Sequence, residues 1–148
     1  MNLAIWDIES SSASTDFGSI IEIGGVLVDE NFKEKDRFNL RCRLPEGEIF
    51  QAMALIVNKT SIKKLTQANL SHYQMLAEVE KIFKKWSPAI FLGWSNIGFD
   101  DEMIRKEFFK GIRYPYLTNA APNKRHDGIN IARAAYAVDP NILEVEFN

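Results

Sequence analysis

The sequence has little cysteine and no long apolar run, and each shortage excludes a class of protein. The single cysteine, Cys42, cannot form a disulfide within the chain, which argues against a disulfide-stapled secreted domain. No apolar run reaches the roughly 20 residues of a membrane-spanning helix, and no charged leader precedes the first apolar segment. We therefore expect a cytoplasmic protein without a membrane contact, in which Cys42 is a small core residue.

Positive charge is also scarce, with 18 Lys and Arg against 20 Asp and Glu, a net charge of −2. Proteins that track along nucleic acid are usually basic, because they gain affinity by releasing counterions from phosphates. An enzyme that holds only a strand end needs less positive charge, since bound metal ions contact the phosphate directly. The basic clusters at 33–43 and 59–64 are expected to be solvated faces. With 148 residues, 46% of them hydrophobic, the chain predicts a single domain over 1–148.

An acidic pair stands in the most apolar part of the N-terminus, where residues 3–8 predict a buried strand. In an extended strand the side chains of Asp7 and Glu9 project from the same face, about 7 Å apart. Two carboxylates at the end of a buried strand repel each other and need protons or a cation for compensation. Hard divalent metal ions bind oxygen ligands of this kind. The simpler alternative is a strand end whose acids face water.

A second acidic group follows another apolar run. Residues 89–94 predict a buried parallel strand, and the helix expected over 101–110 begins directly after Asp100. The connecting loop returns Asp100 towards the strand that carries Asp7. We therefore expect Asp100 to join Asp7 and Glu9.

The next acids along that helix have a simpler explanation. Acidic residues are favoured in the first turn of a helix by its dipole, so Asp101 and Glu102 are expected to be capping or solvated residues. Their spacing predicts ion pairs of Asp101 with Arg105 and of Glu102 with Lys106.

The remaining pattern is typical of an α/β domain. Residues 20–29 and 36–44 predict two strands that pair with the strand of Asp7 in an antiparallel sheet. Periodicity and helix-start residues predict helices after Thr60–Ser61, from Ser71 to about Trp86, over 101–110 and over about 129–138. An antiparallel meander followed by alternating helices and strands is an α/β order.

These motifs resemble a known group of enzymes. Asp7-Ile8-Glu9 matches the first motif of the DnaQ-like (DEDDh) 3′-to-5′ exonuclease superfamily, and residues 93–102 match the second. Residues 114–116 and 127–137 are similar to the segments that follow in bacterial exonuclease I, the family to whose N-terminal exonuclease domain the chain is most similar. The resemblance implies a ribonuclease H-like exonuclease fold, with a mixed sheet, antiparallel N-terminal strands and flanking helices.

The family completes its site with a His-x4-Asp motif on a C-terminal helix, and no such motif occurs in this sequence. We therefore expect a C-terminally truncated exonuclease domain that carries three of the four family acids and is weakly active or inactive. The two histidines, His72 and His126, do not stand where the family histidine falls and are expected to be structural or surface residues. Asp127 is expected to be structural, near the start of its helix.

By resemblance, Asp7, Glu9 and Asp100 would be the catalytic residues and the ligands of two Mg²⁺ or Mn²⁺ ions. The residues implied in substrate binding are Ser10, Ser11, Leu55, Val57 and Asn58. The implied reaction releases nucleoside monophosphates from the 3′ ends of single-stranded DNA. Single-strand binding protein and other repair proteins are the implied partners.

Other interpretations remain open at this point. The chain could be a catalytically inactive nucleic-acid-binding or interaction module of the same fold. It could also be a ribonuclease of the same superfamily, because DNA and RNA are distinguished by 2′-hydroxyl contacts that the sequence does not reveal. Trp6, Trp94 and Phe99 could stack on bases, but their place in or beside apolar strands predicts core positions.

Overall fold

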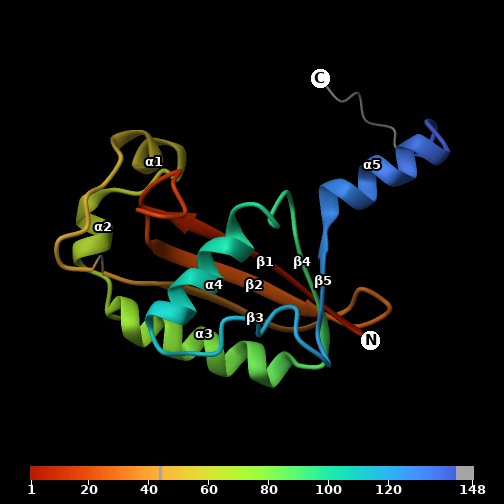
Figure 1. The fold of residues 1–148 in the computed structure, drawn as a ribbon, viewed down its shortest axis with the longest axis horizontal. Helices are drawn as coiled ribbons and strands as arrows, with labels where there is room; N and C mark the ends of the chain where they lie inside the picture. The colour runs from red at the N-terminus through yellow and green to blue at the C-terminus, as the bar shows by residue number, and fades with distance from the viewer. Residues whose placement is uncertain (44, 143–148) are drawn as a thin grey trace.

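The computed structural model describes residues 1–43 and 45–142, which form a five-stranded mixed sheet with helices packed on it (Figure 1). The strands are β1 (Asn2–Ser10), β2 (Ile20–Val28), β3 (Glu34–Arg41), β4 (Ala89–Gly93) and β5 (Lys124–Asp127). The helices are α1 (Ala52–Val57), α2 (Ile62–Thr66), α3 (His72–Trp86), α4 (Asp100–Lys110) and α5 (Gly128–Val138). Within the described residues, no helix combines the length and apolarity needed to cross a membrane.

The sheet has the order β3-β2-β1-β4-β5, with β1 at its centre. β1 and β2 pair antiparallel, as do β2 and β3, whereas β4 runs parallel to β1 and β5 runs parallel to β4. The predicted antiparallel N-terminal strands and the parallel strand at 89–94 are therefore confirmed. The third strand ends at Arg41 instead of residue 44; Cys42 still donates its backbone N–H to the Ile21 carbonyl oxygen of β2 and also forms an isolated bridge with Leu70.

Two elements were not predicted. The strand β5 has the sequence Lys-Arg-His-Asp, which reads as a solvated loop, and it becomes a strand because it pairs with β4 at the sheet edge. The helix α1 has no side-chain cap and no buried residue, and its six residues are all apolar, so its sequence carries neither a start signal nor a helical alternation of apolar and polar positions. Both elements depend on tertiary contacts that local periodicity does not record.

The helix α3 forms where its start signal and its apolar spacing agree. Ser71 caps the helix by accepting a hydrogen bond from the Gln74 backbone N–H, and the Gln74 side chain accepts one from the Ser71 N–H. Its buried side chains are Met75, Leu76, Val79, Phe83 and Trp86. The predicted apolar face is therefore confirmed, and it packs against the sheet.

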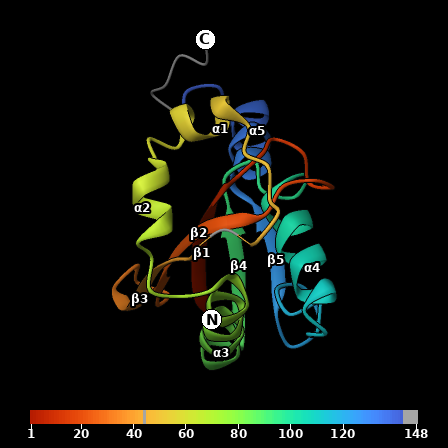
Figure 2. The same cartoon turned by 90° about the vertical axis from the view of Figure 1, so that its left-hand side faces the viewer.

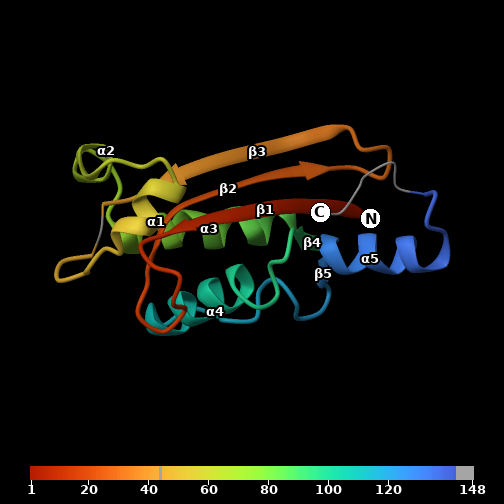
Figure 3. The ribbon, with the colours of Figure 1, turned by 90° about the horizontal axis from the view of Figure 1, so that it is seen from above.

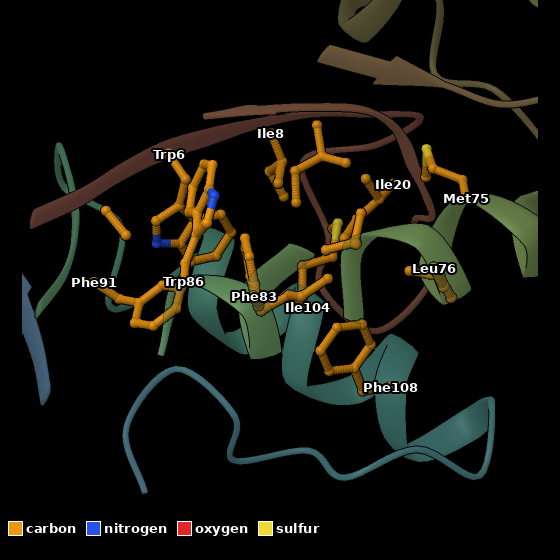
Figure 4. Packing of buried hydrophobic residues seen from close by; sticks show 14 of the residues in the cluster. Trp6, Ile8, Ile20, Met75, Leu76, Phe83, Trp86, Phe91, Ile104 and Phe108 are labelled. Carbon is orange, nitrogen blue, oxygen red and sulfur yellow. The ribbon is translucent and has the colours of Figure 1, made fainter. Parts of the chain in front are cut away.

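Aromatic side chains fill the centre of the core (Figure 4). The ring of Phe83, which is fully buried, lies 4.9 Å from the ring of Phe91 and 5.6 Å from that of Trp6, between ring centroids. Phe38 and Trp86 complete the set, at 6.1 and 6.2 Å from Phe83. The edge-on contacts of Phe83 with rings of the strands connect α3 to β1, β3 and β4.

The two faces of β1 have different environments. Ala4, Trp6 and Ile8 are buried in the core that α3 and α4 cover, whereas Ile5 and Asp7 on the opposite face are exposed. The helix α5 contributes no buried residue and lies on the other side of the sheet from α3 (Figures 1 and 2). One face of the sheet is thus packed, and the other is open beside the acidic pair.

Replacing Phe83 tests this packing. We expect Phe83→Ala to lower the free energy of unfolding by about 3–5 kcal/mol, because it removes the central ring and leaves a cavity. Phe109→Ala is the matched control, since Phe109 lies on α4 with 71% of its surface exposed, and it should change stability by less than about 0.5 kcal/mol. Chemical denaturation measures both values. Equal losses in the two variants would contradict this description of the core.

Candidate active site

The strand β1 carries Asp7 and Glu9 on the open face of the sheet. Trp6 and Ile8, which alternate with them, are only 2% and 6% exposed and point into the core. The predicted common face of the two acids is therefore confirmed. The register of β1 against β2 shifts between Glu9 and Ser10, so the strand changes course directly after the pair.

Asp100, the first residue of α4, lies against the same stretch of β1. The backbone N–H of Ile8 donates a hydrogen bond to Asp100 Oδ1 over 3.3 Å, from between the two acids of the strand. Burial raises the pKa of Asp100 to about 6, and repulsion from Asp7 adds to the shift. The structure thus brings together the three acids that the sequence predicts.

These carboxylates are not neutralised by the protein. Burial, followed by repulsion from Asp7 and Glu22, raises the pKa of Glu9. Glu22 is paired with Arg41, the residue opposite it on β3. In the described part of the chain, Asp7, Glu9 and Asp100 have no ion-pair partner. Their repulsion is a cost that a bound cation would remove.

The chemistry of this acidic trio, Asp7, Glu9 and Asp100, suits a hard divalent ion, because carboxylate oxygens are its preferred ligands. Over residues 1–43 and 45–142, however, no group of three or more His, Cys, Asp or Glu side chains is already arranged to hold a metal ion. Asp7 repels both Glu9 and Asp100 and so stands next to each of them. Metal binding would therefore require the side chains to turn towards a common ion.

A cavity of about 270 Å³ opens beside Glu9. We call it the terminal cavity; its lining includes Ser10, Met53, Val57, Asn58 and Phe99. Asn58 Nδ2 donates a hydrogen bond to the Ser10 carbonyl oxygen over 2.9 Å, which ties the end of β1 to α1. Three of the five predicted substrate residues, Ser10, Val57 and Asn58, thus line a cavity next to the acids. Leu55 does not line it.

Ser11 does not have the position expected of a residue that contacts substrate. It is fully buried, and its hydroxyl donates to Glu48 Oε1 over 2.6 Å while accepting from the Ser19 N–H over 2.9 Å. Its own N–H donates to the Ser19 carbonyl oxygen. These groups are already bonded within the protein, and a direct contact of Ser11 with substrate stays a prediction. The residue supports the turn after Glu9.

Asp101 is not the solvated residue that the sequence predicted. It is 2% exposed, and it accepts hydrogen bonds from Asn96 Nδ2 over 2.9 Å and from Thr118 Oγ1 over 3.2 Å. Its predicted partner Arg105 is replaced by Arg125, whose Nε lies 3.7 Å away. Burial raises the pKa of Asp101 to about 6. The helix turns this side chain into the protein, where it holds α4 to β5.

Glu102 behaves as predicted. It pairs with Lys106, with Nζ and Oε1 3.5 Å apart, and also takes Arg105 as a partner. Arg105 is therefore occupied on the surface of α4 and does not reach the buried Asp101.

Asp127 is structural, as predicted, because it caps α5 by accepting the Ile129 N–H over 3.1 Å and also accepts the Ser95 N–H over 2.9 Å. Its neighbour His126 is exposed on β5. Trp94 was expected in the core but is 62% exposed, because the chain has left β4 at this point.

A second buried acid was missed. Glu107 is 4% exposed, and its Oε2 lies 3.3 Å from Nε2 of His72 at the start of α3. Burial raises the pKa of Glu107 to about 6 and lowers that of His72. A signal existed in the sequence, since Glu107 shares the apolar face of α4 with Ile104 and Phe108 at helical spacing.

No protein-family model matches the chain. Among curated proteins it is similar to exodeoxyribonuclease I of Buchnera aphidicola, with 22% identity over 146 residues, covering 97% of this chain and 30% of the relative. The same protein of Haemophilus influenzae is 24% identical over 138 residues, covering 92% of this chain and 29% of the relative. The chain thus spans about 30% of the length of these relatives.

Solved structures agree with this similarity. Exonuclease I of Escherichia coli in complex with a dA16 oligonucleotide superposes with a TM-score of 0.91 at 20% identity, covering 99% of this chain and 32% of that one. A product-bound exonuclease I gives 0.90 at 19% identity, covering 99% and 34%. The chain matches the N-terminal domain of exonuclease I, and the predicted ribonuclease H-like exonuclease fold is confirmed.

Glu107 makes the stability of the protein depend on pH. Its pKa is about 6 when folded and 4.5 as the ordinary value, so the folded state holds the proton more tightly. The resulting stabilisation is complete below pH 4.5 and is lost as the pH rises through 6. Over this pH range, we expect the free energy of unfolding of Glu107→Gln to change by about 1–2 kcal/mol less than that of the wild type.

Thermal and urea unfolding between pH 4.5 and 7.5 would measure this difference. Glu78→Gln on α3, whose side chain is 45% exposed, is the control and should retain the wild-type dependence. A Glu107→Gln variant whose stability changes with pH as the wild type does would show that the buried carboxyl is not protonated in this range.

Proposed function

We propose that this chain is the acid-bearing part of a metal-dependent exonuclease that removes nucleoside monophosphates from the 3′ end of single-stranded DNA. The observation that carries the proposal is the uncompensated acidic trio: Asp7 and Glu9 on the open face of β1, and Asp100 held against the same strand by the Ile8 N–H. Support comes from the similarity of almost the whole chain to exodeoxyribonuclease I. The ordinary structural roles of acids, capping and ion pairing, do not account for this trio.

Each acid has a role that its position favours. Two divalent ions would stabilise the charge on the attacking and leaving oxygens of a phosphodiester. Asp7 stands next to both other acids and would bind both ions, while Glu9 and Asp100 would bind one each. The Ile8 N–H fixes Asp100 through Oδ1, which leaves Oδ2 to serve as a ligand.

The terminal cavity would hold the last nucleotide of the strand. Met53 and Val57 are 66% and 70% exposed at its apolar wall, and Phe99 lies on another side. Its volume of about 270 Å³ is near the lower end of ligand pockets, about 300 Å³. Ser10 and Asn58 supply polar groups beside Glu9. A nucleotide seated here would place its 5′ phosphate at the acids.

The general base is expected to come from the family's His-x4-Asp motif, because neither described histidine is suited to the role. His72 packs against Glu107, and His126 is exposed on β5. A positioned base contributes about 10²- to 10⁴-fold in rate, so this chain alone should be weakly active. A structure described as an ExoI/SSB-Ct complex supports single-strand binding protein as a partner.

Metal binding tests the proposal without requiring turnover. We expect Mn²⁺ or Mg²⁺ to raise the melting temperature of the chain, because ligands that bind only the native state stabilise it. Asp7→Asn should abolish the increase. The same variant should melt higher than the wild type in EDTA, because it removes repulsion from Glu9 and Asp100.

Asp16→Asn, whose side chain is 69% exposed, is the control and should keep the metal response. In the full gene product with Mg²⁺, Asp7→Asn should also lose cleavage of a 5′-labelled single strand. A metal response that survives in Asp7→Asn would place the ions elsewhere.

A further inference from the structure

The helix α1 forms a wall of the terminal cavity without packing into the core. Its residues Met53 and Val57 line the cavity, but the helix has no buried residue and no side-chain cap. Figure 3 shows α1 next to the red turn after β1, residues 11–19, which supplies another wall through Ser12 and Ala13. A helix of six residues is not stable alone and usually depends on packing. Polar contacts must therefore hold these two walls together.

Hydrogen bonds tie both ends of α1 to the chain after β1. At the start of the helix, the Gln51 N–H donates to the Ser11 carbonyl oxygen over 3.0 Å. Gln51 Oε1 also accepts the Ala13 N–H over 3.2 Å. At the end of the helix, the Asn58 side chain donates to the Ser10 carbonyl oxygen. The position of α1 thus depends on where Ser10 and Ser11 lie.

The carboxylate of Glu48 fixes this part of the turn. Its Oε1 accepts the Ser11 hydroxyl over 2.6 Å, and its Oε2 accepts the Ser19 hydroxyl over 3.1 Å, so both oxygens are used. Ser11 Oγ in turn accepts the Ser19 N–H over 2.9 Å. One carboxylate therefore closes the two ends of the turn through charge-assisted hydrogen bonds, which are stronger than those between neutral groups. In the described part of the chain, no Lys or Arg forms an ion pair with Glu48.

Buried groups on α3 and α4 lie near Glu48. Burial raises the pKa of Glu107 and lowers that of His72, and the negative charge of Glu48 acts on both groups. Ser19 also hydrogen-bonds to Glu107 and so lowers its pKa. Glu107 lies two turns after Asp100 on the same face of α4. Glu48 thereby connects the turn after β1 to the helix that carries Asp100.

We infer that Glu48 is a positioning residue of the terminal cavity: through Ser11 and Ser19, its carboxylate holds the turn after β1 against the start of α1. The inference rests on the proposed function for the nucleotide that the cavity holds. Glu48 does not itself line the cavity. It acts on a bound nucleotide by keeping the two walls in place, so its loss should weaken nucleotide binding and leave metal binding intact.

Nucleotide binding and amide exchange test the inference on this chain. The probes are dTMP with Mg²⁺, followed by calorimetry, and exchange of the Ser19 and Gln51 amides, followed by NMR. We expect Glu48→Ala to bind dTMP about tenfold more weakly, the effect of losing a hydrogen bond to a charged group. Both amides should exchange about tenfold faster, because the turn opens more often. The increase in melting temperature with Mn²⁺ should persist, because the acidic trio is unchanged.

Further variants separate positioning from a general loss of stability. Glu48→Gln should keep its dTMP affinity within about twofold, because its amide accepts the Ser11 hydroxyl and donates to Ser19 Oγ. Ser11→Ala should match Glu48→Ala, and the double variant should lose no more than either single variant, because both remove the same contact. The control Glu46→Ala removes an exposed acid from the same segment and should bind dTMP as the wild type does.

Unchanged amide exchange in Glu48→Ala would overturn the inference, as would faster exchange with wild-type dTMP affinity. An equal loss in Glu48→Gln or in Glu46→Ala would overturn it as well. Additive losses in the double variant would show that Ser11 contacts the nucleotide independently of Glu48, and would also contradict the inference.

Failure of the proposed function has a different signature. A wild type that binds no dTMP, together with faster exchange in Glu48→Ala, would reject the nucleotide in the cavity and retain Glu48 as the residue that positions α1. Metal-dependent cleavage by the full gene product, at the wild-type rate in Glu48→Ala, would leave the exonuclease standing without this role of Glu48.

Discussion

Repulsion among three carboxylates is the interaction on which the rest of this structure depends. Asp7 and Glu9 share a face of β1, and Asp100 is held against the same strand by the Ile8 N–H. Burial and repulsion from Asp7 raise the pKa of Asp100 to about 6, and no cation in the described part of the chain pairs with it to lower that pKa. A fold that keeps such a group maintains it at the expense of stability, which is common where charge is needed for chemistry.

The packed face of the sheet makes this arrangement possible. Aromatic packing around Phe83 fixes β1 on one side, so that the alternating residues present their acids on the other. The buried Asp101 has a complementary role, because its bonds to Asn96 and Thr118 set the start of α4 and thus the position of Asp100. Neighbouring acids in one motif thereby serve different purposes: one faces the site, and the other supports it.

The sequence predicts those features that depend on local periodicity. Alternation located the strands, apolar spacing located α3, and the spacing of Asp7 and Glu9 placed both on one face. The sequence alone did not predict the features that depend on partners distant in the chain. Asp101 is buried because Thr118 and Arg125 come from later segments. The Ser11 hydroxyl is hydrogen-bonded to Glu48 and Ser19. The segment β5 becomes a strand because it pairs with β4 at the edge of the sheet.

The central claim is that Asp7, Glu9 and Asp100 jointly bind divalent ions. The most direct measurement is anomalous diffraction from crystals of this chain soaked in Mn²⁺ together with dTMP. The account predicts a peak within coordination distance, about 2.0–2.4 Å, of carboxylate oxygens of both Asp7 and Asp100. It also predicts that the dTMP phosphate lies at that ion and its base in the terminal cavity. Manganese bound only at other surface carboxylates, with the trio unliganded at saturating Mn²⁺, would contradict the account.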